Sequence, residues 1–123
     1  MPRYVVRHNE KQEFCVELRS PEGALLLDCM SFTTHASALV GITNVRVLAP
    51  FESRYLRIAP PAAALPCSFL MQDYKQRTVA NGADHPTVEA REGAILACQT
   101  YGPVARVVDE TGGPGLPPLE YLQ

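Results

Sequence analysis

The stretch Leu25–Val45, LLLDCMSFTTHASALVGITNV, joins an apolar, strand-like run to a helical pattern. Apolar and small residues continue at helical spacing beyond the strand and form one stripe, which consists of Ala38, Gly41, Ile42, Val45 and Ala49. A glycine inside a helix costs about 1 kcal/mol relative to alanine, so Gly41 needs a structural reason. We expect close packing of the helix backbone against a sheet.

The same pattern returns later in the chain, which indicates two copies of one unit. A second stripe with a central glycine follows 52 residues after the first and consists of Ala90, Gly93, Ala94, Ala97 and Tyr101. The segment Arg54-Tyr55-Leu56-Arg57 likewise echoes Arg3-Tyr4-Val5-Val6-Arg7 near the N-terminus. We interpret the repeated glycine as the mark of a repeated helix on a repeated sheet.

Alternation and turn residues predict the remaining elements. In the first copy we expect three strands at 3–8, 14–19 and 25–32, and a helix that is capped by Thr33 or Thr34 and ends at Pro50. In the second copy, Phe69 and Met71 align with Phe14 and Val16, and a shorter third strand covers 78–80. A helix from about Thr87 to Tyr101, capped by Asp84 or His85, and a closing strand at 104–109 complete the pattern.

The predicted fold is α+β, with two tandem β-β-β-α repeats, one helix per repeat on an antiparallel sheet, and a pseudo-twofold axis. Residues 1–50 form the first repeat, and residues 51–111 form the second, divergent repeat with the closing strand. One such unit buries too little apolar surface to be stable, so both copies share a core in one compact domain. Residues 112–123 form a Gly- and Pro-rich tail that we expect to be flexible, or to dock on a sheet edge of this chain or a partner.

The segment Leu18–Val45 resembles the repeat of the YegP-like family of small bacterial proteins. The likeness lies in a strand, a turn with Gly23, an apolar strand ending at Phe32, and the pattern Ala-x-x-Gly-Ile-x-x-Val from Ala38 to Val45. It implies a tandem β-β-β-α fold, but neither an established activity nor catalytic residues. Residues 54–109 depart from the pattern, and Ala94 replaces the expected isoleucine, which suggests a specialised second repeat.

Composition excludes several classes of protein. The chain has 123 residues, 46% of them hydrophobic, and a formal net charge of −2, which argues against disorder and against general nucleic-acid affinity. The N-terminus has no apolar signal region, and no apolar run approaches the roughly 20 residues of a membrane span. We therefore expect a cytoplasmic protein with reduced thiols.

No motif of catalysis or metal binding is present in the sequence. The four cysteines, at 15, 29, 67 and 98, lack the close pairs typical of zinc sites and are interpreted as buried apolar side chains. The histidines at 8, 35 and 85 are isolated, and Asp84-His85 is explained by helix capping. We expect no metal, no cofactor and no enzyme activity, with a Cys- or His-dependent enzyme as the third alternative.

The repeated Arg-Tyr pairs are the best candidates for a binding surface, because both residue types are frequent at interface hot spots. The predicted partner-binding residues are Arg54, Tyr55, Arg57, Pro60, Pro61, Arg3, Tyr4 and Arg7. A non-catalytic protein-interaction module that uses the strand and Pro-rich loop of the second repeat is the expected function. Weak nucleic-acid binding is the alternative, and a charged edge strand that blocks unwanted pairing would be a purely structural explanation.

Overall fold

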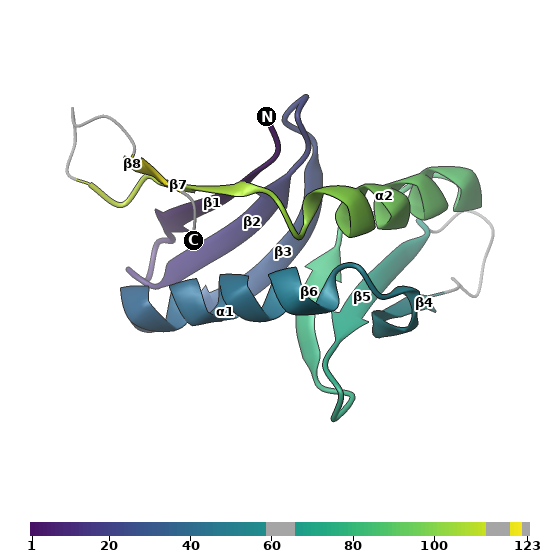
Figure 1. The fold of residues 1–123 in the computed structure, drawn as a ribbon, viewed down its shortest axis with the longest axis horizontal. Helices are drawn as coiled ribbons and strands as arrows, with labels where there is room; N and C mark the ends of the chain where they lie inside the picture. The colour runs from purple at the N-terminus through teal and green to yellow at the C-terminus, as the bar shows by residue number, and fades with distance from the viewer. Residues whose placement is uncertain (59–65, 113–118, 122–123) are drawn as a thin grey trace.

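The computed structural model describes residues 1–58, 66–112 and 119–121, the last of these by their backbone only. Two helices lie over the same face of a single twisted sheet (Figure 1). The elements, in chain order, are β1 Arg3–His8, β2 Phe14–Arg19, β3 Leu25–Phe32, α1 His35–Leu48, the 3-10 turn η1 Glu52–Arg54, β4 Tyr55–Ile58, β5 Ser68–Gln72, β6 Thr78–Gly82, α2 Val88–Tyr101, β7 Arg106–Asp109 and β8 Leu119–Tyr121.

The eight strands form one sheet in the order β4-β5-β6-β3-β2-β1-β7-β8. Neighbouring strands are antiparallel, except that β7 runs parallel to β1. The predicted purely antiparallel sheet is therefore a mixed one. The reason is that β7, after crossing from α2, reaches the outer edge of β1 in the same direction as β1.

The order β1-β2-β3-α1 recurs as β4-β5-β6-α2, which confirms the predicted fold class. Strand pairing gives the correspondence between the copies: Leu18 pairs with Leu27, and Met71 pairs with Ala80. Leu18 and Met71 are 53 residues apart, and so are Leu27 and Ala80. The predicted alignment of Phe69 and Met71 with Phe14 and Val16 was therefore wrong by two positions. The copies meet where β3 pairs with β6, at Asp28 and Asn81, and these two residues are also 53 apart.

Both helices begin at equivalent threonines. Thr34 accepts a hydrogen bond from the Ser37 backbone, and Thr87 accepts one from the Ala90 backbone. The cap at Thr34 was predicted, whereas the caps proposed at Asp84 or His85 were wrong. Thr87 follows Pro86 directly, so the helix begins after the proline and not at it.

Three hairpin turns share one hydrogen-bonding pattern. A polar side chain at the first position, Asn9, Ser20 or Asp73, accepts a hydrogen bond from the backbone N–H four residues later. The fourth residue of each turn has a positive φ, 61° at Gln12, 90° at Gly23 and 62° at Gln76. The turn before β6 is thus equal in length to its counterpart before β3.

The core lies between the sheet and the two helices. Its strand residues come from both copies, and the helices contribute Ala38, Ile42, Val45 and Leu48 from α1 and Ala94, Ile95 and Cys98 from α2. The helical stripes are related by an offset of 53, so Gly41 corresponds to Ala94 and not to Gly93. A shared core of this kind explains how two short units become one stable domain.

The two helix glycines that suggested the repeat have different environments. A Cβ atom on Gly41 would lie 2.4 Å from the ring of Phe32, so this helix does approach the end of β3 closely. Gly93 is exposed, and a Cβ atom there would meet nothing within 4 Å. The prediction of close packing is right for the first glycine and wrong for the second.

Part of the tail continues the sheet. Residues Leu119–Tyr121 form β8, which pairs antiparallel with β7. The prediction that the tail holds no regular structure is wrong for these three residues, and the alternative of docking on an edge of its own sheet describes them. Within the described ranges, neither helix is long and apolar enough to cross a membrane.

Candidate functional site

The two tyrosines of the predicted binding surface are buried structural residues. Tyr4 is 0% exposed and donates a hydrogen bond to the Gly102 carbonyl at 2.6 Å. Tyr55 is 6% exposed and donates to the Ala49 carbonyl, also at 2.6 Å. Each acceptor is the C-cap residue of a helix, and burial raises the pKa of both phenols, so they remain donors. The prediction that these tyrosines contact a partner is therefore wrong.

The arginines of the second copy are held by the protein itself. Arg57 lies on the helix side of β4, where it forms ion pairs with Glu52 at 2.6 Å and with Glu92 at 2.8 Å. The hydrogen bond from Arg57 lowers the pKa of Glu92. Arg54 lies over the Tyr74 ring at 4.6 Å and donates to the Asp73 carbonyl at 3.0 Å. Pro60 and Pro61 lie outside the described residues.

The remaining predicted residues, Arg3 and Arg7, lie on the face of the sheet that the helices leave uncovered. We refer to this surface as the open face. Strand alternation places Tyr4 and Val6 toward the helices, so Arg3, Val5 and Arg7 point the other way. The Arg-Tyr segments therefore do not form one surface. In the first copy Tyr4 and the two arginines lie on opposite faces of the sheet, and in the second copy Arg57 is held in ion pairs.

The second copy presents apolar side chains on the open face. Leu56 and Ile58 in β4 are 49% and 42% exposed, and Leu56 pairs directly with the partly buried Leu70 in β5. β4 is also the last strand of the sheet, and none of the described strands pairs with its outer edge. We refer to Leu56, Ile58, Leu70 and the outer edge of β4 as the apolar edge.

A histidine–carboxylate pair links α1 to β7. His35 Nε2 lies 2.5 Å from Asp109 Oδ2, and Asp109 Oδ1 accepts hydrogen bonds from the Thr111 backbone and hydroxyl. Burial by itself would raise the pKa of Asp109, but the hydrogen bonds from Thr111 and His35 outweigh it and hold the pKa below its usual range. The His35 ring packs edge-on against Phe14 at 5.6 Å. The pair therefore holds the start of α1 to the strand that covers β1.

Three of the four cysteines have core environments, whereas the prediction of a buried side chain is wrong for Cys15, which is partly exposed. Cys29, Cys67 and Cys98 are buried, and burial raises the pKa of Cys98 to about 12 and also raises the pKa of Cys29. The thiols of Cys29 and Cys98 are thus protonated at neutral pH. His85 stacks on Phe69 at 6.5 Å, and none of the described residues forms a hydrogen bond with its buried Nε2. Nowhere in the described chain do three His, Cys, Asp or Glu side chains group as metal ligands would.

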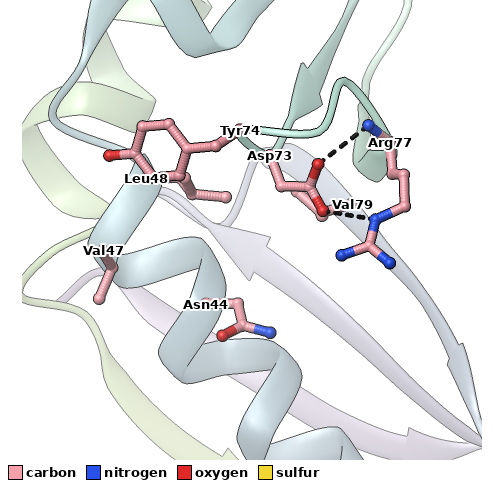
Figure 2. A pocket seen from close by; sticks show the side chains of 7 residues that line it. All are labelled: Asn44, Val47, Leu48, Asp73, Tyr74, Arg77 and Val79. Carbon is pink, nitrogen blue, oxygen red and sulfur yellow. Dashed lines mark hydrogen bonds and ion pairs between the residues drawn. The ribbon is translucent and has the colours of Figure 1, made fainter.

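A shallow groove runs between α1 and the hairpin of β5 and β6. Figure 2 shows one end of it, a hollow of about 250 Å³ between Asn44, Val47 and Leu48 on the helix and the turn at Asp73–Arg77. Asp73 accepts hydrogen bonds from the Arg77 backbone and side chain, so the turn is internally neutralised. The groove continues past Gly41 toward Phe32 and Met30. Its lining combines apolar side chains with polar ones such as Asn44 and Thr78.

Two features of the surface were missed in the sequence. The His35–Asp109 pair joins residues that are 74 positions apart, and no local pattern could indicate it. The apolar edge could have been found, because the alternation in Tyr55-Leu56-Arg57-Ile58 places Leu56 and Ile58 on the face opposite Tyr55. Attention to the residue types Arg and Tyr concealed this alternation.

Comparison with known proteins identifies the fold. No protein-family model and no curated protein sequence matches the chain. Among solved structures, the YegP protein of unknown function from E. coli matches with a TM-score of 0.81 and 22% identity over 91% of this chain and 95% of YegP. A UPF0339 protein from Shewanella oneidensis matches with a TM-score of 0.81 and 19% identity over 89% of this chain and 92% of its own. The chain therefore has the YegP-like fold, as the resemblance in the first repeat predicted.

Proposed function

We propose that this protein is a non-catalytic interaction module that binds a protein partner through the apolar edge of its second repeat. The observation that carries the proposal is the contrast between the two equivalent strands. The outer edge of β1 is covered by β7, whereas β4 ends the described sheet and places two half-exposed aliphatic side chains beside its edge. An edge strand with unpaired backbone groups is a ready template for an added strand.

The usual protection of an edge strand is weak at this position. Charges on an edge discourage pairing, and the only charged residue of β4, Arg57, is neutralised by Glu52 and Glu92 on the helix side. The side chains on the open face, Leu56 and Ile58, carry no charge. This supports a contact that combines backbone hydrogen bonds with burial of aliphatic side chains.

Paired surface variants test the proposal. The protein and two double variants, Leu56→Glu with Ile58→Glu and Arg3→Ala with Arg7→Ala, would be used to capture partners from a lysate of the native host. Tyr55 is unsuitable for this experiment, because its loss would disturb the fold. We expect a partner that is retained by the protein and by the arginine variant but lost from the glutamate variant. Its affinity would then be measured with purified components, with an expected loss of about 2 kcal/mol or more.

Other outcomes would contradict the proposal. Equal capture by all three proteins would place the contact elsewhere, and loss only from the arginine variant would move it to the first repeat. Sedimentation of the purified protein separates out self-association, since a change of mass in the glutamate variant alone would identify a second copy as the occupant. Unchanged thermal midpoints would show that both variants remain folded.

A further inference from the structure

The outer edge of β4 is the counterpart of an edge that a strand covers elsewhere in the same sheet. The order β4-β5-β6-β3-β2-β1-β7-β8 is symmetric about the pair of β6 and β3, apart from β7 and β8 (Figure 1). The relation that matches β1 with β4 therefore matches β7 with a place beside the outer edge of β4, where none of the described strands lies. Since β7 runs parallel to β1, a strand in that place would run parallel to β4.

The backbone of β4 presents the groups that such a strand needs. In the first repeat the Glu110 N–H donates to the Val6 carbonyl at 2.8 Å, so the backbone of Val6 is directed toward β7. Strand register makes Arg57 the counterpart of Val6. The N–H and C=O of Arg57 are thus directed outward, together with the carbonyl of Tyr55, whereas the Tyr55 N–H already donates to the Glu52 carbonyl. A parallel strand could bond to these three groups.

The side chains around this place are aliphatic where those of the first repeat are polar. His35, the first residue of α1, lies within hydrogen-bond distance of Asp109 in β7. The counterpart of His35 is Val88, the first residue of α2, and it is 51% exposed. On the open face, Ile58 is the counterpart of Arg7. A strand beside β4 would therefore meet aliphatic side chains at positions where the first repeat has a histidine and an arginine.

Charges near this place are already balanced. Arg57 forms ion pairs with Glu52 and Glu92, and Arg91 forms one with Glu92. The cluster contains two arginines and two glutamates, so its formal net charge is zero. The residue of an added strand that lies beside Arg57 therefore need not be charged, although its counterpart in β7 is Asp109.

We propose that a run of four aliphatic residues in a partner protein adds to β4 as a parallel strand, in the place that corresponds to β7. This inference rests on the proposed function, since it specifies the partner of the same apolar edge. The first and third residues of the run lie on the helix side, as Val107 and Asp109 do in β7, and the third reaches Val88. The second and fourth residues lie on the open face beside Leu56 and Ile58.

Peptides based on β7 test the proposal. The probe is a fluorescent peptide VARVVVVT, which is the sequence of residues 104–111 with Asp109→Val and Glu110→Val, flanked by lysines for solubility. The comparison peptide keeps the sequence VARVVDET. We expect fluorescence anisotropy to show about tenfold tighter binding of the probe than of the comparison peptide. The double variant Leu56→Glu with Ile58→Glu should bind the probe about tenfold more weakly or worse, because the carboxylates oppose an apolar strand.

Two methylated forms of the probe separate strand addition from general hydrophobic contact. The N–H at the Val108 position of the probe donates to the Tyr55 carbonyl in the proposed register, whereas the N–H at the next position points away from β4. Methylation of the first nitrogen should weaken binding about tenfold or more, and methylation of the second should change it little.

A nitroxide at the N-terminus of the probe reports the direction of the strand. In the parallel arrangement it should broaden the NMR amide signals of Tyr55 and its neighbour Met71 more than those of Ile58 and Ser68, which lie at the other end of the pair of β4 and β5. The variant Arg3→Ala with Arg7→Ala is the matched control, and it should bind the probe as the unchanged protein does.

Several results would overturn the parallel strand: no binding of the probe, equal affinity for the comparison peptide, equal losses for both methylated forms, equal losses in both protein variants, or the opposite order of broadening. A dimer that only the glutamate variant abolishes would also overturn it, because two identical β4 edges pair antiparallel about a twofold axis. The proposed function survives each of the peptide results if the glutamate variant still loses its partner in the lysate experiment. A partner that this variant retains would instead contradict the proposed function itself.

Discussion

The two halves of the open face occupy equivalent positions of the fold but differ in chemistry. In the first repeat the outward positions of β1 and β2 carry Arg7, Glu17 and Arg19, and in the second repeat their counterparts are Ile58, Leu70 and Gln72. On the helix side Leu18 corresponds to Met71 and Tyr4 to Tyr55, whereas the buried Val6 corresponds to the ion-paired Arg57. The charged outward positions of the first copy are thus uncharged in the second, whereas Val5 and its counterpart Leu56 are aliphatic in both.

The same comparison holds for the packing inside each copy. Gly82 corresponds to Cys29, and Phe69 corresponds to Val16. In the second copy, the first of these positions thus has a smaller residue than in the first copy, and the second position has a larger one. Gly41 and Phe32 in the first copy likewise correspond to Ala94 and His85 in the second. Such exchanges keep the volume of each copy nearly constant, which cores tolerate better than single changes.

The largest expected effect tests this exchange of volume at Gly82. A Cβ atom on Gly82 would lie 2.3 Å from the ring of Phe69, which is fully buried. Gly82→Val should lower the free energy of unfolding by about 3 kcal/mol, measured by urea denaturation. The double variant Gly82→Cys with Phe69→Val recreates the first copy and should be more stable than Gly82→Cys alone. If Gly82→Val unfolds at the same urea concentration as the unchanged protein, the packing argument is wrong.

Next in size is the loss of the two equivalent tyrosine hydroxyls. Tyr4→Phe and Tyr55→Phe each leave the carbonyl of a helix C-cap without its donor. We expect each change to cost about 1 to 2 kcal/mol, and the two costs to be similar. Thermal denaturation of both variants measures this. A much smaller cost at Tyr55 would show that the end strand β4 opens readily, which would separate the two copies energetically.

Local signals in the sequence predicted much of the first repeat. The bounds of β1 and β3 and the cap at Thr34 were correct, because alternation, turn residues and capping all act over a few neighbouring positions. The parallel pairing of β7 and the addition of β8 were not predicted, because they depend on contacts between distant segments. The predicted alignment of the two helices was wrong by one position, because it matched Gly41 with Gly93 by residue type, whereas the apolar stripes match Gly41 with Ala94.

The candidate site was less predictable than the fold. Arg3 and Arg7 were correctly placed on a strand, but their position beside Arg19 and Arg106 requires the register of three strands. Tyr4 and Tyr55 were assigned to a surface because of their residue type, although the alternation of β1 already indicated a buried face. Residue type suggests what a side chain can do, and register decides whether it faces solvent.

A pH-dependent effect on stability should report on Asp109, which links the start of α1 to β7, the strand that covers β1. Because the pKa of Asp109 is held low in the folded state, its contribution to stability is present at neutral pH and is lost as pH falls through that lowered value. Asp109→Asn should therefore be less stable than the unchanged protein at pH 7, and the difference should shrink in acid. The lowered pKa values of Glu17, Asp73 and Glu92 cause acid loss in both proteins and cancel in the comparison. A pH-independent difference would contradict the assignment.

The smallest expected effect concerns the two helix glycines. Gly93 is exposed and has free space around it, so Gly93→Ala should stabilise the protein by up to about 1 kcal/mol through helix propensity. Gly41→Ala gains the same propensity but must displace the Phe32 ring, so its net effect should be close to zero or unfavourable. Urea denaturation of both variants gives the difference.

A double variant isolates the ring as the cause of that difference. With Phe32→Ala in place, the alanine at position 41 no longer meets an aromatic carbon, and Gly41→Ala should then stabilise the protein about as much as Gly93→Ala does. Phe32→Ala alone supplies the reference state, because removal of the ring has its own cost at the end of β3. If Gly41→Ala and Gly93→Ala are equally stabilising while Phe32 is still present, the ring moves aside freely, and Gly41 has no packing role in the first repeat.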